Sequence, residues 1–186
     1  MSKAVSALGG ISYTGFAEVA EAGLQGMITV RGDLGSAKMK KAVKAATGTA
    51  VPAPRRIISS GDKSAAWMSP DELLLLVPYA GAAATVGALE KTLAGEHALV
   101  ADVSDARAMF RIKGPKAQEA LMKLCPVDFS SVAADEIRRT RAAQVAAAVW
   151  MSGQDEYSLV SFRSSAGYVM GLLEVSVRKG AELFPA

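Results

Sequence analysis

Apolar and polar positions alternate most regularly along residues 107–113 (RAMFRIK). A period of two predicts a strand with one face on the core and the other in solvent. Gly114-Pro115 comes next and favours a helix start, with the proline at the first helical position. Cys125-Pro126 ends this helix, because the residue before a proline is pushed out of the helical region. With a further strand at residues 98–103, the pattern predicts one compact strand–helix unit.

Similar local patterns occur earlier in the chain. Residues 27–31 (MITVR) have the β-branched composition of a strand, and residues 34–47 carry apolar side chains at helical spacing before a stop at Gly48. Residues 51–60 contain two prolines and predict an extended connection that leads to an edge strand. Residues 65–77 predict a hairpin, and its second strand (ELLLLV) is apolar on both faces, as in a central covered strand.

The later segments are less uniform. An alanine-rich helix over about residues 80–93 closes at Gly95. Residues 137–150 fit either a helix or a strand, and the acidic pair before them favours a helix start. The alternation near their end favours a hairpin over roughly 141–162 instead. Ser164 or Ser165 then caps a final helix with a long apolar stripe.

These elements sum to an α+β protein with a mixed, largely antiparallel sheet and packed helices. Residues 1–24 keep no helical or strand period for long, so we expect an N-terminal arm that is partly disordered or ordered against a partner. Residues 25–186 are expected to form a single domain. Both halves of the chain share a strand–helix–hairpin–helix order, although no exact repeat is visible.

The composition indicates a globular protein but no particular catalytic or binding chemistry. The 186 residues are 51% hydrophobic and 21% charged, which is typical of a globular chain that can bury its own core. The formal net charge of +3 is too small to indicate nucleic-acid binding without a concentrated basic face. One cysteine, a start unlike a signal peptide and only short apolar runs predict a cytoplasmic protein outside the membrane.

Candidate catalytic groups are sparse. The sequence contains neither a dinucleotide-binding glycine motif nor a Walker-type phosphate loop, and its single His97 and single Cys125 have no companions at zinc spacing. We therefore expect no metal site and an inert, partly buried thiol. Acidic pairs such as Asp102 with Asp105 occur at turns, where carboxylates normally cap backbone groups. The residues alone argue against an independent enzyme.

Four stretches, in the same order along the chain, carry a family resemblance. They are MSPDELLLLVP (68–78), VADVSDARAMFRIKGPKAQEALMKLCPVDFS (100–130), RTRAAQVAAAVW (139–150) and YSLVSFRSSAGYVMGLL (157–173). Together they resemble the gamma subunit family of heterotetrameric sarcosine oxidase over roughly residues 25–175. The resemblance is fairly specific, because the patterns D-V-S-D-A-R, G-P-x-A, C-P-x-D and F-R-S-x-x-x-Y occur together.

The resemblance implies a fold like the folate-binding domain of aminomethyltransferase and a non-catalytic structural role. The complex would oxidatively demethylate sarcosine to glycine, with tetrahydrofolate as one-carbon acceptor and hydrogen peroxide as a product. FAD, FMN, NAD and tetrahydrofolate would be held by partner chains, and this chain would carry no cofactor. Its partners would be the alpha, beta and delta subunits, and the isolated chain could associate with itself.

We expect a few side chains to form contacts with other subunits. Arg107, Arg111 and Arg163 are candidates because arginine makes several directed hydrogen bonds at interfaces, although ordinary surface arginines fit equally well. Tyr168 is a further candidate, with core packing on the final helix as the alternative.

Two other functions remain open on the sequence. One is a stand-alone folate-binding one-carbon module, in which Asp102 would be the buried acceptor for a pterin; the alternative is that Asp102 caps the turn through Ser104 or Asp105. The other is an RNA-contacting domain that uses the basic residues of 38–44 and 138–141. A solvated helix face explains those lysines as well, because no aromatic residue interleaves with them.

Overall fold

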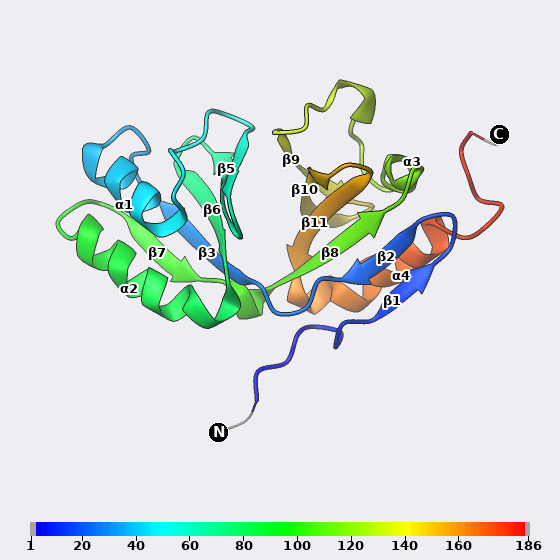
Figure 1. Cartoon of the computed structure of the whole chain (residues 1–186), viewed down its shortest axis with the longest axis horizontal. Helices are drawn as coiled ribbons and strands as arrows, with labels where there is room; N and C mark the ends of the chain where they lie inside the picture. The colour runs from blue at the N-terminus through cyan, green and yellow to red at the C-terminus, as the bar shows by residue number, and fades with distance from the viewer. Residues whose placement is uncertain (1–2, 185–186) are drawn as a thin grey trace. The chain divides into compact units, whose positions relative to one another are not determined.

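The computed structural model describes residues 3–184 and contains two compact units (Figure 1). One unit is the continuous segment Leu24–Ser104, and the other combines residues 3–23 with residues 105–184. The chain thus enters the discontinuous unit, builds the inserted unit and returns. The chain passes between the two units after residue 23 and again after residue 104, and the expectation of a single domain over residues 25–186 stays a prediction.

The continuous unit is a five-stranded antiparallel sheet with two helices. The strand order is β4-β5-β6-β3-β7. The strands are β3 (Gly26–Arg31), β4 (Ile57–Ser60), β5 (Lys63–Ser69), β6 (Glu72–Val77) and β7 (Leu99–Asp102). Helices α1 (Ala37–Thr47) and α2 (Ala82–Leu93) pack against each other, and their inward residues share one apolar cluster with β3 and β6.

Local sequence signals explain these elements. The Ser36 hydroxyl accepts a hydrogen bond from Met39 N at 3.0 Å and caps α1, and Gly48 ends the helix in the left-handed region with φ 74°. The predicted hairpin is β5–β6, and β6 is the middle strand of the sheet. Leu73–Val77 are all buried, so both faces of this strand are covered, as its ELLLLV pattern predicted.

The discontinuous unit is a six-stranded antiparallel sheet with the order β1-β2-β8-β11-β10-β9. Its strands are β1 (Ser12–Thr14), β2 (Glu18–Glu21), β8 (Arg107–Lys113), β9 (Ile137–Ala142), β10 (Val145–Gly153) and β11 (Glu156–Phe162). Helices α3 (Ala117–Met122) and α4 (Ala166–Ser176) complete it, and the side chains of both helices join one cluster with β8, β10 and β11. Within residues 3–184, the strand pairings of both sheets are antiparallel, which confirms the α+β class.

The N-terminal segment differs from the expected arm. Residues 12–21 form β1 and β2, and β2 pairs with β8 from Glu18↔Lys113 to Glu21↔Phe110. The buried Glu21 carboxylate accepts hydrogen bonds from the Ser6 hydroxyl and from Gly10 N, which fixes the chain ahead of β1. Residues 1–2 of the expected arm lie outside the described residues.

Three local predictions differ from the structure. Helix α3 begins at Ala117, so Pro115 precedes the helix, because Gly114 takes φ 138° and Lys116 is the N-cap. Residues 137–142 form a further strand before the predicted hairpin, although the acidic pair ahead of them favoured a helix start. Ser165 occupies the N-cap position of α4, but its side chain makes no capping hydrogen bond.

Candidate subunit-contact surface

Asp102 lies at the end of β7, where its carboxylate closes a turn. Asp102 Oδ1 accepts hydrogen bonds from Ser104 N at 2.9 Å and from the Ser104 hydroxyl. The same buried hydroxyl oxygen accepts a hydrogen bond from Met27 N at 3.0 Å. Asp102 itself is exposed. Its carboxylate therefore ties β7 to β3 through Ser104, in the capping arrangement that was the alternative to a pterin acceptor.

Arg107, Met109 and Arg111 occupy every second position of β8 and therefore lie on the same side of the strand. The Arg107 guanidinium lies 4.7 Å from the centroid of the Phe162 ring, its cross-strand neighbour on β11. This is a cation–π contact. Arg107 is half-buried, Arg111 is exposed and Met109 is buried, so this side of the strand is less solvated than the alternation predicted.

Arg111 lines a shallow pocket of about 300 Å³ together with Lys113, Glu18 and Glu156. Lys113 lies opposite Glu18 on one neighbouring strand and opposite Glu156 on the other. Opposite charges at such cross-strand positions stabilise a sheet. Arg111 lies opposite Ala20 and Ser158, which are small and uncharged. Its guanidinium is thus a positive group at an open position of the sheet surface.

Arg163 holds the N-terminal segment. Its Nη2 donates hydrogen bonds to Val5 O at 3.1 Å and to Ser6 O at 3.2 Å. Residue 163 belongs to the single turn η4 (Arg163–Ser165), directly before α4, so the anchor fixes the start of the chain beside this helix. Arg163 therefore has a structural role within the unit, and only part of its half-buried side chain is accessible.

Tyr168 lies on the outer side of α4 and is 51% exposed. The alternative of core packing is wrong for this residue, because the inward stripe consists of other residues: Ala166, Val169, Met170, Leu173 and Ser176. Val175, one further exposed apolar residue on the same helix, is 53% exposed. This outer surface was not predicted from the sequence, although the single charged residue of α4 could have indicated it.

His97 and Cys125 lie in different surroundings. His97 is exposed and lines a pocket of about 340 Å³ with Arg31 and Asp71, whose side chains form an ion pair at 2.7 Å. Hydrogen bonds from Ser69 and Arg31 lower the pKa of Asp71. Cys125 is buried, and this burial raises the pKa of its thiol to about 11. Among residues 3–184, no group of three or more histidine, cysteine, aspartate or glutamate side chains is arranged to hold a metal ion.

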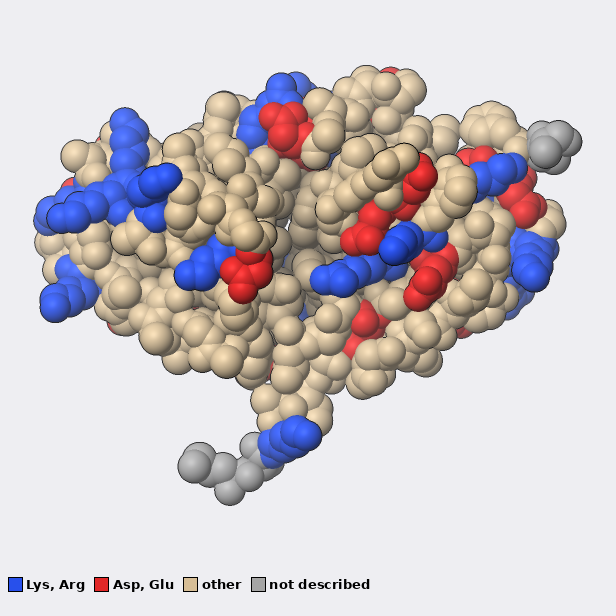
Figure 2. Space-filling view, in the orientation of Figure 1, with Lys and Arg blue, Asp and Glu red and all other residues tan. Residues whose placement is uncertain are grey.

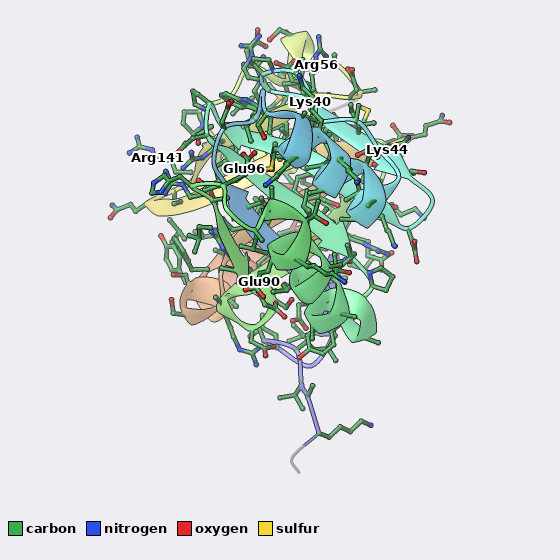
Figure 3. The ribbon with its side chains drawn as sticks, turned by 90° about the vertical axis from the view of Figure 1, so that its left-hand side faces the viewer. Lys40, Lys44, Arg56, Glu90, Glu96 and Arg141 are labelled. Atoms are coloured by element: carbon green, nitrogen blue, oxygen red, sulfur yellow. The ribbon has the colours of Figure 1, made fainter. Side chains whose placement is uncertain are left out.

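Lysines dominate the solvent side of α1. Figure 2 shows blue side chains gathered over this part of the continuous unit, and Figure 3 shows Lys40 and Lys44 on α1 with Glu90 on neighbouring α2. Two of the four lysines bind backbone oxygens: Lys38 Nζ donates to Ala94 O and Lys44 Nζ donates to Gly48 O. In the described part of the chain, no helix combines the length and apolar character needed to span a bilayer.

Comparisons with known proteins agree with the topology. The chain is similar to a chain of the heterotetrameric sarcosine oxidase from Corynebacterium sp. U-96, solved in complex with pyrrole 2-carboxylate, with a TM-score of 0.80 and 23% identity over 89% of this chain and 87% of that chain. It is also similar to the glycine cleavage system aminomethyltransferase T from Bartonella henselae, with a TM-score of 0.62 and 15% identity over 86% of this chain and 46% of that chain. The chain therefore has an α+β fold similar to that of aminomethyltransferase T.

Sequence similarity then identifies the family. The model of the sarcosine oxidase, gamma subunit family matches residues 31–177. The gamma subunit of sarcosine oxidase from an Arthrobacter species is 31% identical over 144 residues, which are 75% of this chain and 68% of that protein. A gamma subunit from Corynebacterium sp. strain U-96 is 30% identical over 148 residues, or 77% of this chain and 69% of that protein. The chain belongs to the sarcosine oxidase gamma subunit family, as the sequence motifs had indicated.

Proposed function

We propose that this chain is a non-catalytic structural subunit of a heterotetrameric sarcosine oxidase in the cytoplasm. Its partners are the alpha, beta and delta subunits, which hold FAD, FMN, NAD and tetrahydrofolate. The assembled enzyme oxidatively demethylates sarcosine to glycine, passes the one-carbon unit to tetrahydrofolate and forms hydrogen peroxide. The observation that carries the proposal is the family match, which runs from β3 to the end of α4.

The roles of the polar side chains support a structural subunit. Asp102 binds Ser104, Arg163 binds the carbonyl groups of residues 5 and 6, and Glu21 binds Ser6 and Gly10. Each of these groups forms its hydrogen bonds with other residues of the same chain. Arg111 and Tyr168 are different, since both reach an open surface, and we assign them to contacts with partner subunits.

Co-expression tests this function directly. The chain is produced with and without the alpha, beta and delta subunits of the same oxidase, and each purified sample is assayed for bound flavin and for sarcosine-dependent hydrogen peroxide. We expect the chain to co-purify with the flavin-bearing subunits and to show neither flavin nor oxidase activity alone. Sarcosine oxidation by the isolated chain, or its failure to co-purify with the three subunits, would contradict the proposal.

A further inference from the structure

An open groove lies between helices α1 and α2 of the continuous unit. It has a volume of about 230 Å³, and alanines form much of its walls: Ala42, Ala45 and Ala46 on α1, and Ala84 and Ala88 on α2. Ala45, Ala84 and Ala88 are exposed. A surface helix normally presents polar side chains to solvent, so exposed alanines on two neighbouring helices leave an apolar hollow. We call this hollow the α1–α2 groove.

The hydroxyl groups that line the groove are already hydrogen-bonded. Thr85 Oγ1 donates to Gly81 O at 2.8 Å, and Thr92 Oγ1 donates to Ala88 O at 2.9 Å. Both hydroxyls are bound to the backbone of α2, so the threonines offer their methyl groups to the groove. A small-molecule site usually combines a larger cavity, of roughly 300–1,000 Å³, with several converging polar groups. The α1–α2 groove therefore suits apolar side chains of another protein.

Lysines flank this apolar groove. Lys63 of β5 lines it directly. Lys41 precedes Ala45 by four residues, which places it on the groove side of α1. Lys38 Nζ donates to Ala94 O at 2.8 Å, so its ammonium group lies at the C-terminal end of α2. Figure 2 shows the resulting group of blue side chains over α1.

The two charged residues of α2 differ in their position relative to the groove. Lys91 follows Ala88 by three residues and shares the groove side of the helix. Glu90 is two residues from both Ala88 and Thr92, which places it on the other side. Neither Glu90 nor Asp62, in the turn before β5, lines the groove. We call the four flanking lysines the lysine rim: Lys38, Lys41, Lys63 and Lys91.

We infer that the α1–α2 groove is a docking site for an acidic amphipathic helix of a partner subunit of the oxidase. This inference rests on the proposed function. Apolar side chains of the docked helix lie in the groove, and its carboxylates lie beside the lysine rim. One helix can do both, because its side chains project at fixed spacings and an amphipathic helix binds through its apolar face. Opposite charges then fix which partner binds and in which register.

A second copy of this chain does not offer such a helix. Symmetric pairing through the groove would place one lysine rim against the other, which like-charge repulsion opposes. A non-symmetric contact would need a helix with several carboxylates. Within residues 3–184, α1 contains no acidic residue, and α2, α3 and α4 contain one each: Glu90, Glu119 and Glu174. Charge complementarity therefore selects a different subunit.

RNA also complements positive charge but does not match the groove. Binding of single-stranded RNA depends on aromatic side chains that stack with its bases, in addition to basic residues that contact phosphates. The walls of the α1–α2 groove are alanines and threonine methyl groups instead. These small apolar groups suit the apolar side chains of a protein helix.

Charge and volume are tested separately, each with a control on the same helix. Lys41→Glu reverses one charge of the lysine rim. Lys40→Glu is its control, since exposed Lys40 lies two residues before Ala42 and thus on the other side of α1. Ala88→Leu fills the groove. Ala83→Leu is its control, because Ala83 is exposed and does not line the groove.

Competition for assembly gives the readout. Each full-length variant is co-expressed with a differently tagged wild-type chain and with the alpha, beta and delta subunits. Mass spectrometry of the purified oxidase then gives the ratio of variant to wild-type chain, and circular dichroism checks the fold of each isolated variant. We expect Lys41→Glu and Ala88→Leu to be incorporated about tenfold less than the wild type, as like-charge contact and overfilling predict. Lys40→Glu and Ala83→Leu should be incorporated equally with it.

Several outcomes would overturn the inference. Incorporation of both groove variants at the wild-type level would do so and leave the proposed function standing, as would equal losses for the groove variants and their controls. An isolated wild-type dimer that Ala88→Leu converts to a monomer would assign the groove to self-association. RNA binding that Lys41→Glu abolishes while incorporation is unchanged would assign the lysine rim to RNA. A wild-type chain that does not assemble with the three subunits contradicts the proposed function itself.

Discussion

Gly15 and Val177 lie so close that a Cβ added to Gly15 would be 1.7 Å from the carbonyl oxygen of Val177. The next residue, Phe16, donates its backbone N–H to the same oxygen at 2.8 Å. The turn between β1 and β2 thus packs directly against the residue that follows α4. This contact joins two segments at opposite ends of the chain, and only glycine leaves room for it.

We therefore expect Gly15→Ala to destabilise the protein strongly. The added methyl group has to displace a backbone carbonyl, so the free energy of unfolding should fall by about 2–3 kcal/mol, at the upper end of overpacking substitutions. Urea denaturation of the purified full-length chain measures this change. Gly87→Ala is the matched control, and it should raise stability by up to about 1 kcal/mol because it adds a methyl group to an exposed helix position. Equal effects of the two substitutions would show that the Gly15 contact does not constrain the fold.

Cys125 gives the protein a specific pH dependence. Burial raises the pKa of its thiol from 9.0 to about 11, so the folded state holds this proton more tightly than the unfolded state does. The associated stability is complete below pH 9 and is lost as the pH rises from about 9 to about 11. A shift of this size corresponds to about 2–3 kcal/mol. Urea titrations at pH 8 and pH 11 should show a steeper loss for the wild type than for Cys125→Ala, which retains every other titrating group. Parallel losses in the two proteins would contradict this role of Cys125.

Glu119 holds the C-terminal segment against α3. Its Oε2 accepts hydrogen bonds from Leu183 N at 2.8 Å and Phe184 N at 3.2 Å, while Lys123 Nζ donates to Ser176 O and Ala181 O. Desolvation acts to raise the pKa of Glu119, but the two backbone hydrogen bonds and the nearby lysines outweigh it and hold the pKa below its usual value.

We expect Glu119→Gln to loosen residues 183 and 184, because a neutral amide is a weaker acceptor for these two N–H groups. Amide hydrogen exchange at Leu183 should accelerate severalfold, and in the wild type the same acceleration should appear as the pH falls below about 4.5, since the stabilisation by a carboxylate of lowered pKa is lost on protonation. Glu182→Gln removes a neighbouring charge without touching these bonds and serves as the control. Unchanged exchange at Leu183 in Glu119→Gln would show that the carboxylate does not hold the segment.

Local patterns predicted the continuous unit well. The lysine-rich α1, its stop at Gly48 and the β5–β6 hairpin each depend on residues close together in sequence, so propensity and turn chemistry were sufficient. Strand β9 is different, because its arginines occupy both sides of the strand: Arg138 is half-buried, whereas Arg139 and Arg141 are exposed, so no apolar alternation marks it in the sequence. Pro115 misled the prediction of the α3 start, since proline is also compatible with the turn ahead of a helix.

Contacts between segments far apart in the chain could not be predicted from the sequence. Strand β2 is four residues long and pairs with β8 about ninety positions later, so no local signal marks it. The same reason applies to Arg163, whose carbonyl partners lie more than 150 residues earlier in the chain. The assignment of Arg111 and Tyr168 to subunit contacts stays a prediction: both side chains are exposed, and the outer side of α4 could be distinguished only once its inward stripe was known.

The role of Asp102 distinguishes two functions for the chain, a folate-binding module and a structural subunit. Its carboxylate is committed to Ser104, and Ser104 in turn receives the Met27 N–H, so the group supports the join between β7 and β3. Asp102→Ala should lower the free energy of unfolding by about 1 kcal/mol, as the loss of a capping carboxylate does. Ser104→Ala should cost more, about 1–3 kcal/mol, because it leaves the buried Met27 N–H without its acceptor. Calorimetric titration of the isolated wild-type chain with tetrahydrofolate should give no binding heat at millimolar ligand. Saturable heat that disappears in Asp102→Ala, with the fold intact by circular dichroism, would instead establish a folate site at this turn.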